Sequence, residues 1–340
     1  MGVRIGYKAS AEQFDPTTLL GYARHAEEVG LDIVATSDHF QPWRHREGHS
    51  PAALPWLGAA TQATSRALLG TSVLTPTLRY EPAIVAQAFA TLGHLAPGRV
   101  FLGVGTGEAM NETPATGGAF PGRKERRLRM AEAIDLIRRL WREERVDFEG
   151  EYYKTSQATI YDRPEQEVPI YVAASGPLAA KLAGRVGDGF ICTSGKDPQL
   201  YLDLLEKVRE GAEAAGRDHA EIKHMIEIKV SYDRDKQKAY DNTHFWAPLA
   251  LTPEQKEGIE DPMEMERIAD ENLDQAHTRF IVSDDPDEVV EKIGTYLDLG
   301  FDDLLLHGPG PDQTRFLDQF AEDVLPKLRA RADAVTTAAA

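Results

Sequence analysis

Three side chains that can take part in catalysis stand close together in the sequence: the Asp38 carboxylate, the His39 imidazole and the Trp43 indole. They follow an apolar run at 33–35, which predicts a buried strand. Pro42 cannot continue that strand, because it has no N–H to donate. In parallel α/β folds, ligands bind where the strands leave the sheet. We therefore expect His39 to take part in chemistry, with partners from elsewhere in the chain.

Glu108 is a second candidate for proton transfer, and it follows the apolar run 100–105. A partly buried glutamate tends to have a raised pKa, and a carboxylate such as Asp38 beside His39 favours a protonated imidazole. Groups shifted in opposite directions can work as an acid–base pair near neutral pH. Spacing alone leaves an alternative open, in which His39 only anchors a loop and Glu108 pairs with a lysine.

Other polar residues stand at the ends of expected strands. Lys8, Glu227, Lys229 and His307 belong to the first, seventh and eighth of these strands, and such a set is too polar for a packing layer. We interpret Glu227 and Lys229 as a structural ion pair.

Two features suit an anion. The segment Ser-Gly-Pro at 175–177 begins an expected helix, whose free N–H groups favour phosphate, although an ordinary helix cap is the better explanation of this segment taken alone. Lys196, Lys256 and Arg279 supply positive charge, but only the fold can bring them together.

Composition limits the classes of partner. The chain has 340 residues and a formal charge of −17, which argues against nucleic acid and anionic membrane as partners. No apolar run is long enough to span a membrane, and the first residues do not resemble a secretory signal. One cysteine, Cys192, excludes an internal disulfide, and no HExxH or paired-histidine motif indicates a metal site. We expect a cytoplasmic protein without a metal.

Apolar runs alternate with helix-like stretches along the whole chain. Eight strands are expected at 4–8, 32–37, 68–74, 100–105, 169–174, 189–193, 225–232 and 303–307. Helices are expected at 16–28, 51–66, 82–95, 123–144, 177–186, 200–215, 286–299 and 316–329. This alternation predicts a (β/α)₈ TIM barrel. A Rossmann-like sheet is the alternative, but its glycine-rich first turn is absent at 8–11 and glycines cluster at 103–107 instead.

Two insertions interrupt the alternation. The first, at 146–161 after the fourth helix, has two β-rich pieces around Gly150 and predicts a hairpin. The second, at about 235–272 after the seventh strand, is polar and mostly helical in character. We expect one barrel domain over 1–330, followed by a frayed tail of small residues at 331–340.

Several segments together resemble a known family. They read YKASAEQF at 7–14, SDHFQPWRH at 37–45, LGTSVLTPT at 69–77, FLGVGTGE at 101–108, DGFICTSGK at 188–196, FWAPL at 245–249 and TPEQK at 252–256. They resemble the coenzyme F420-dependent glucose-6-phosphate dehydrogenases of the bacterial-luciferase-like superfamily, whose fold is a (β/α)₈ barrel. The resemblance extends from Gly6 to about Arg329.

The resemblance implies an oxidoreductase reaction. A hydride passes from C1 of a sugar 6-phosphate, glucose 6-phosphate first of all, to C5 of the 8-hydroxy-5-deazaflavin coenzyme F420, giving 6-phosphogluconolactone. His39 and Glu108 resemble the catalytic pair, one removing the C1 hydroxyl proton and the other serving the N1 side of the deazaflavin. Which residue has which role stays open. Trp43 is implied to lie near the reacting carbon, where its ring face can stabilise positive charge.

The resemblance also implies the binding residues and a homodimer. The segment Ser72-Val73 resembles the family's non-prolyl cis peptide behind the deazaflavin. For the substrate phosphate, the implied residues are Thr193, Lys196, Lys256 and Arg279. For the coenzyme, they are Asp38, Ser72, Val73, Thr75, Thr106, Gly107, Glu108, Asn111, Ser175, Gly176, Leu178 and Ala179.

Two departures from the family keep alternatives open. Ser175 stands where the family often has glycine, and the segment 272–278 before Arg279 differs in sequence and length. A related enzyme for fructose or mannose 6-phosphate, or another F420-dependent alcohol dehydrogenase or FMN monooxygenase of the superfamily, is therefore an alternative. A non-catalytic coenzyme-binding protein is a third hypothesis, against which His39, Glu108 and Trp43 argue.

Overall fold

Eight parallel strands close into a barrel. The computed structural model describes residues 2–256 and 258–339, and leaves out Met1, Glu257 and Ala340. Each strand pairs with the next in sequence order, and the last pairs with the first, so that the sheet has no free edge within the barrel. The TIM-barrel prediction is confirmed, and each strand falls at its expected place. The strands are β1 (Arg4–Ala9), β2 (Ile33–Thr36), β3 (Leu68–Thr71), β4 (Val100–Val104), β7 (Ile170–Ala173), β8 (Gly189–Thr193), β9 (Lys223–Tyr232) and β11 (Asp303–His307).

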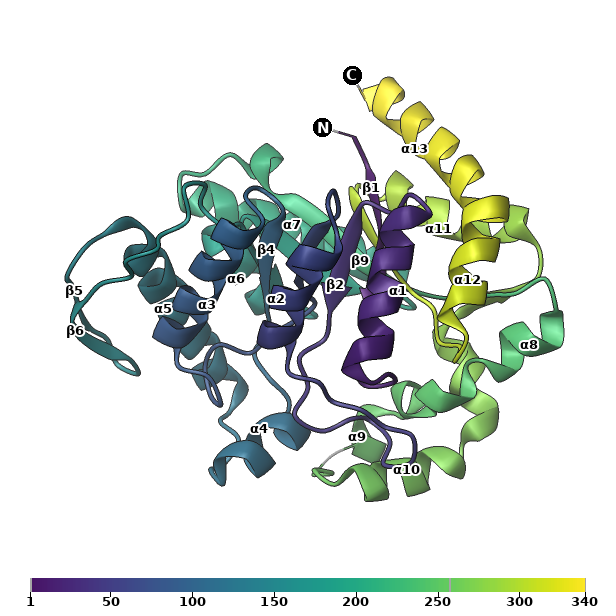
Figure 1. Cartoon of the computed structure of the whole chain (residues 1–340), viewed down its shortest axis with the longest axis horizontal. Helices are drawn as coiled ribbons and strands as arrows, with labels where there is room; N and C mark the ends of the chain where they lie inside the picture. Colours follow the sequence, from purple (N-terminus) through teal and green to yellow (C-terminus); the bar gives the residue numbers. More distant parts are fainter. Residues whose placement is uncertain (1, 257, 340) are drawn as a thin grey trace.

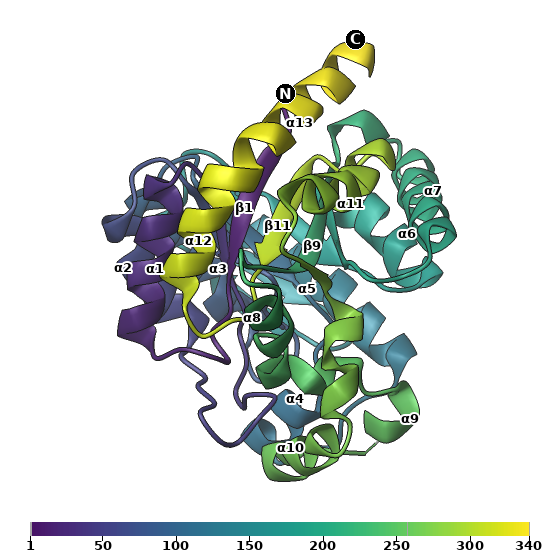
Figure 2. The ribbon, with the colours of Figure 1, turned by 90° about the vertical axis from the view of Figure 1, so that its right-hand side faces the viewer.

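Helices form a ring outside the barrel (Figures 1 and 2). The first of them shows why these segments become helical: Asp15 caps it by accepting bonds from the Thr17 and Thr18 N–H groups, and Pro16 takes the first position. The ring consists of α1 (Pro16–Glu28), α2 (Ala53–Ala63), α3 (Pro82–Leu95), α5 (Arg123–Arg142), α6 (Pro177–Val186), α7 (Pro198–Ala214), α11 (Pro286–Asp298), α12 (Gln313–Gln319) and α13 (Leu325–Ala339).

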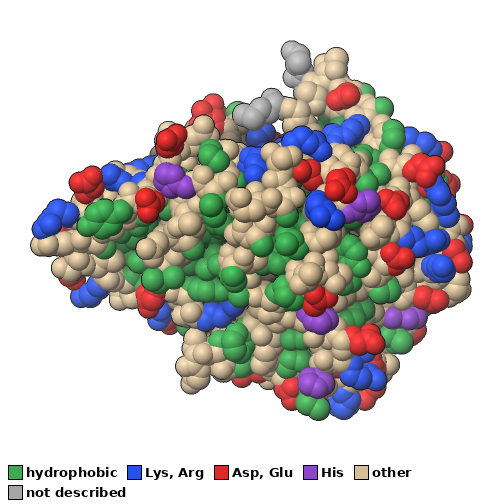
Figure 3. All heavy atoms as spheres, in the orientation of Figure 1, with side chains coloured by type: hydrophobic (Ala, Val, Ile, Leu, Met, Phe, Trp, Pro, Cys, Tyr) green, Lys and Arg blue, Asp and Glu red, His purple; other side chains and the backbone are tan. Residues whose placement is uncertain are grey.

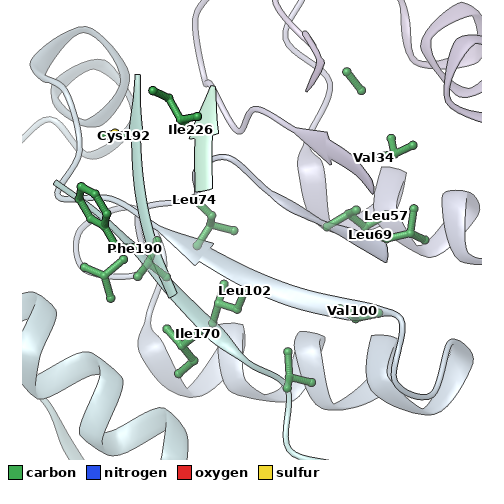
Figure 4. Packing of buried hydrophobic residues seen from close by; sticks show 14 of the residues in the cluster. Val34, Leu57, Leu69, Leu74, Val100, Leu102, Ile170, Phe190, Cys192 and Ile226 are labelled. Carbon is green, nitrogen blue, oxygen red and sulfur yellow. The ribbon is translucent and has the colours of Figure 1, made fainter. Parts of the chain in front are cut away.

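The core has two parts, because side chains alternate between the two faces of each strand. Outward-facing residues such as Val34, Leu69 and Leu102 pack against the helices, as Figure 4 shows. A smaller cluster fills the barrel interior with residues that include Phe101 and Tyr171. Interior glycines make room for these rings: a Cβ at position 70 would overlap the Phe101 ring.

Both insertions adopt the predicted character. The first is an antiparallel hairpin of β5 (Val146–Glu149) and β6 (Lys154–Ala158), which extends beyond α5 at one edge of the molecule (Figure 1). The second contains α8 (Lys236–Asp241), η2 (His244–Ala250), α9 (Pro253–Lys256), α10 (Pro262–Asp270) and η3 (Leu273–Arg279). Helices α9 and α10 lie with α4 (Ala109–Thr116) at the end of the barrel opposite the termini, which is the end where the strands finish (Figures 1 and 2).

Three features differ from the predictions. Helix α4 was not expected, since Pro114 lies inside it and proline disfavours a helix interior. The short strand β10 (Ile281–Ser283) extends the sheet beside β9 and was also missed. The expected frayed tail is wrong for residues 331–339, because α13 continues to Ala339 through alanines, the best helix formers.

Figure 3 shows acidic and basic side chains interspersed over one face of the molecule, with hydrophobic side chains gathered across the middle of that face. In the described part of the chain, no helix is both long and apolar enough to cross a membrane.

Candidate active site

A cavity of about 530 Å³ opens at the carboxyl ends of the strands. Its wall contains most of the residues predicted for the site: Asp38, His39, Trp43, Ser72, Val73, Thr75, Thr106, Gly107, Glu108, Asn111, Ser175, Thr193, Lys196, Lys256 and Arg279. Three predicted coenzyme residues, Gly176, Leu178 and Ala179, do not line it. They lie at the start of α6, where the Leu178 side chain is exposed.

His39 lies between two carboxylates and a buried amide. Its Nε2 is 3.4 Å from Glu12 Oε1 and 3.9 Å from Glu108 Oε2, and its Nδ1 is 3.2 Å from Asn111 Nδ2. The Ser37 hydroxyl donates to Glu12 Oε2 at 2.5 Å, which orients that carboxylate. The predicted juxtaposition of His39 and Glu108 is therefore present in the structure.

The surroundings of this pair differ from those expected. The Glu108 side chain is 49% exposed, because it stands at the N-cap of α4 and makes no capping bond. The carboxylate beside His39 comes from Glu12 and not from Asp38. Asp38 turns away from His39 and binds Arg79, with 2.8 Å between Oδ2 and Nη2.

Behind Asp38 lies a second buried carboxylate. Glu112 is 3.3 Å from Arg79 Nε, so that one guanidinium serves both acids. Burial raises the pKa of Glu112, and Arg79 opposes this rise only in part. Arg79 therefore holds together the segments that follow β2 and β4.

Trp43 connects the acid–base residues to the cationic part of the cavity. Its ring centroid is 5.6 Å from that of His39, and Lys256 Nζ lies 5.3 Å from the same Trp43 ring, at cation–π distance. Burial lowers the pKa of Lys256 to about 8, with Glu108 opposing the shift and Arg279 and Lys229 adding to it.

Three cations in the wall lack a carboxylate partner. Among the described residues, Lys196, Lys256 and Arg279 make no ion pair, and Arg279 Nε is buried without a hydrogen-bond partner. Burial of a charge without a partner is costly, and Lys256 and Arg279 are partly buried, with the exposed Lys196 in the same wall, so together the three indicate a site for an anionic ligand.

Another part of the cavity wall is apolar. Val73, Ala173, Ile191 and Leu249 line the cavity, and the peptide bond between Ser72 and Val73 is cis, as the resemblance implied. A Cβ at position 105 would lie 2.5 Å from Val73 Cγ2, so this close packing requires glycine. Of these residues, Val73, Ala173 and Ile191 belong to one apolar cluster, and such a cluster can pack against a flat ring.

Comparison with known proteins gives the family. The family model for luciferase-like monooxygenases matches residues 2–303. This chain belongs to the luciferase-like family. Two curated relatives named F420-dependent glucose-6-phosphate dehydrogenase come from Nakamurella multipartita and Intrasporangium calvum. They are 61% and 60% identical over 330 and 331 residues, covering 96% of this chain and 97% and 99% of their own.

A solved structure supports the same placement within the luciferase-like family. It is an F420-dependent secondary alcohol dehydrogenase in complex with an F420-acetone adduct. It superposes with a TM-score of 0.90 at 37% identity, and the match covers 96% of this chain and 99% of that one. The predicted resemblance to this branch of the family is confirmed.

A buried cluster of charged side chains also lines the cavity. Glu227 Oε2 is 3.2 Å from Lys8 Nζ, and Glu227 Oε1 is 3.6 Å from Lys229 Nζ. Burial would raise the pKa of Glu227, but the two ammonium groups outweigh it and hold that pKa well below its usual range. The ion pair predicted for Glu227 and Lys229 is present, and it lines the site as well.

His307 completes this cluster. Burial lowers the pKa of His307, so its imidazole is neutral near pH 7. His307 Nδ1 lies 3.5 Å from Glu227 Oε1, whereas Nε2 has no hydrogen-bond partner among the described residues, and the Trp246 ring packs edge-on at 4.4 Å between centroids. A buried imidazole nitrogen without a partner can bind a polar ligand group.

Sequence reasoning missed Glu12 and Trp246 as site residues. Glu12 follows β1 by three residues, so the rule that functional side chains follow strands would have found it. Trp246 comes from the second insertion, and its position depends on a bond from its indole N–H to Gln13 Oε1 at 3.0 Å. No local pattern in the sequence signals that bond.

Proposed function

We propose that this protein is a coenzyme F420-dependent glucose-6-phosphate dehydrogenase. It transfers a hydride from C1 of glucose 6-phosphate to C5 of oxidised F420 and gives 6-phosphogluconolactone. The names of relatives that are about 60% identical support the reaction class. The single observation that supports a sugar phosphate as substrate is the group of three cations, Lys196, Lys256 and Arg279, for which the described residues offer no carboxylate partner.

The cavity fits a deazaflavin. The apolar surface of Val73, Ala173 and Ile191 suits one face of a flat ring, and polar groups of Thr75, Thr106 and Asn111 stand around it. When bound, the coenzyme supplies an electrophilic carbon that accepts a hydride. We assign coenzyme binding to these residues together with Asp38, Ser72, Gly107, Glu108, Ser175, Gly176, Leu178 and Ala179, the last three at the start of α6.

The substrate phosphate is held by point charges and one planar group. Lys196 and Lys256 supply ammonium groups, Arg279 can donate two parallel bonds to phosphate oxygens, and Thr193 supplies a hydroxyl. With the phosphate held there, C1 faces the acid–base residues at the other end of the Trp43 ring. His39 and Glu108 then move the C1 hydroxyl proton, and the ring face of Trp43 stabilises positive charge at C1.

A second candidate is an F420-dependent enzyme for a different alcohol. The structural neighbour with an F420-acetone adduct favours it at the level of the fold. An alcohol without a phosphate would leave three cations in the wall unmatched, which favours a sugar 6-phosphate. Fructose and mannose 6-phosphate remain alternatives to glucose 6-phosphate, since all three carry the same phosphate.

The decisive experiment is a matrix of assays on the purified protein. Oxidised F420, NADP and FMN are each offered with glucose, fructose and mannose 6-phosphate, and with isopropanol. We expect the F420 absorbance to fall with glucose 6-phosphate and not with isopropanol. Reduction of F420 by isopropanol alone, or no reduction by any sugar phosphate, would reject the proposal.

The oligomeric state and the cellular location of the protein are also proposals. We propose a homodimer, on the family resemblance, and light scattering coupled to size-exclusion chromatography tests it. We propose a cytoplasmic location, and the charge of −17 argues against binding to nucleic acid or to an anionic membrane.

A further inference from the structure

The side-chain amide of Asn111 is held in one orientation. Its Oδ1 accepts a bond from the Phe40 N–H at 2.9 Å and another from the Gln41 N–H at 3.1 Å. A backbone N–H can only donate, so the amide oxygen must face both of them. The flipped amide would set its NH₂ group against two donors at a site where Asn111 is only 4% exposed.

This orientation directs the Asn111 nitrogen at His39. Nδ2 lies 3.2 Å from His39 Nδ1, and an amide N–H can only donate, so these two atoms form a hydrogen bond only when Nδ1 offers a lone pair. At the other side of the ring, Nε2 faces Glu12 at 3.4 Å and Glu108 at 3.9 Å, and carboxylates only accept. The Nε2 side therefore selects the neutral form with its proton on Nε2. At Nδ1, the Asn111 amide as donor and the Gln41 carbonyl oxygen as acceptor compete at the same distance of 3.2 Å, and the bond from Asn111 is made only in this neutral form.

The site also accepts the doubly protonated imidazole. The Gln41 carbonyl oxygen is 3.2 Å from Nδ1 and can accept from it, while Asn111 Nδ2 has Glu108 Oε2 at 3.5 Å as a second acceptor. The form that the site disfavours has its proton on Nδ1 and a bare Nε2. In that form, the Nε2 lone pair would face two carboxylates.

We propose that Asn111 is a positioning residue that keeps neutral His39 in the Nε2–H tautomer, so that the imidazole meets the substrate as a hydrogen-bond donor. The tautomer is independent of the reaction, whereas its mechanistic consequence rests on the proposed function. With Nε2 already protonated, the base for the C1 hydroxyl is the Glu108 carboxylate, which is half exposed and makes no capping bond.

With Glu108 as the base, each bond that breaks is matched by a bond that forms. The O–H bond of the C1 hydroxyl breaks, and its proton bonds to a carboxylate oxygen of Glu108. The electron pair of that bond becomes the second bond of the C1 carbonyl. The C1–H bond breaks at the same time, and its electron pair leaves with the hydrogen as the hydride accepted at C5 of F420.

The tautomer can be read directly by nitrogen-15 NMR of the histidine side chains. A ring nitrogen that carries a proton and one that carries a lone pair resonate far apart, and the His39 signals are assigned by their loss in His39→Gln. At a pH where titration shows the ring to be neutral, we expect a protonated-type Nε2 and a lone-pair-type Nδ1. The reverse pattern in the wild-type protein overturns the proposal.

The variant Asn111→Asp replaces only the amide NH₂ group that faces His39 with a carboxylate oxygen. One oxygen still accepts from the Phe40 and Gln41 N–H groups, while the other replaces the amide donor by an acceptor facing Nδ1. The charged groups near the ring are Glu12 and Glu108 at Nε2, and Lys256 beyond the Trp43 ring. We expect the ring to keep both protons to higher pH than in the wild type, and turnover near pH 7 to fall at least ~100-fold.

The matched control is Asn272→Asp. Asn272 Nδ2 donates to the Ile268 carbonyl at 2.8 Å, away from the cavity, so the same exchange should leave the His39 spectrum and the turnover unchanged. An Asn111→Asp protein with the wild-type His39 spectrum and titration overturns the proposal. If the tautomer is as expected but no sugar phosphate reduces F420, the proposed function fails and the role of Asn111 stands.

Discussion

Two sets of cations line the cavity, and they differ in their partners. Lys8 and Lys229 share the Glu227 carboxylate, in a cluster where all three side chains are almost fully buried. Lys196, Lys256 and Arg279 have no carboxylate partner in the part of the chain that the structure describes. Removing a charge from the first set leaves buried charges unmatched, whereas the second set is unmatched until an anion binds.

This difference separates stability from ligand binding within one cavity. A buried ion pair contributes little net stability compared with apolar residues, but breaking it by removal of one partner is costly. A cation without a partner destabilises the free protein and stabilises the complex with an anion. The two sets should therefore respond in opposite ways to substitution.

The largest expected effect is on Glu227→Gln. The change keeps the shape but leaves Lys8 and Lys229 buried beside a neutral amide, so we expect the free energy of unfolding to fall by about 3–5 kcal/mol. Chemical denaturation monitored by circular dichroism measures it. Glu149→Gln is the matched control, since Glu149 pairs with Lys154 on the exposed hairpin, where solvent screens the pair and its loss should be far smaller. A loss as small as that of the control would remove Glu227 from the structural set.

The second prediction concerns Lys256→Ala. One charge-assisted bond to phosphate is worth roughly 1.5–3 kcal/mol, so the Michaelis constant for glucose 6-phosphate should rise by about 10- to 100-fold. Binding of F420, measured by fluorescence quenching, should change little, and the free energy of unfolding should not fall, because a partly buried cation without a partner is removed. Lys154→Ala on the hairpin is the control. Equal weakening of substrate and coenzyme would contradict the assignment of Lys256 to the phosphate.

The third prediction is a pH profile. The pKa of Lys256 is lowered to about 8, so its ammonium loses its proton as the pH rises through 8, and the affinity for the phosphate dianion falls. Because the unfolded chain still holds this proton up to about pH 10.4, the same lowered pKa favours the folded state more as pH rises from 8 to 10. The ratio kcat/KM should therefore decline above pH 8.

The variant Lys256→Arg tests whether deprotonation of Lys256 causes the decline of kcat/KM above pH 8. Arginine stays charged throughout, so the alkaline decline of kcat/KM should be lost or moved well above pH 8. An unchanged decline in Lys256→Arg would assign it to another group, such as Lys229, whose pKa burial also lowers.

The barrel could be predicted from the sequence because its signal is local. Each strand is a short apolar run followed by a helix with its own start signals, and Asp15 with Pro16 is one example. The strand-end rule then collected His39, Glu108, Lys8, Glu227 and His307 at one end of the barrel, where the structure has them. The strand and helix signals and the strand-end rule all depend on residues that are neighbours in the sequence.

The remaining features depend on contacts between distant residues. The Asp38 carboxylate was expected beside His39, but Arg79 draws it away, and the separation of 41 residues between them leaves no pattern. Lys256 and Arg279 come from the irregular second insertion, so only the family resemblance brought them to the phosphate. Glu12 fits the strand-end rule by its place after β1, but no local pattern pairs it with His39, because their contact spans two loops.

The smallest expected effect is on the loop that carries Trp43. Asp270 binds Arg44 and Arg46 with 2.7 and 2.5 Å between the charged atoms, but it is 35% exposed. Glu266 also holds this loop, by accepting the His45 and Arg46 backbone N–H groups at 2.9 and 2.8 Å. Asp270→Asn should therefore cost less than about 1 kcal/mol of unfolding free energy, and the cost should shrink in 1 M salt. A loss as large as that of Glu227→Gln would show that exposed ion pairs, too, determine stability here, and the contrast between the two sets of cations would no longer follow from burial.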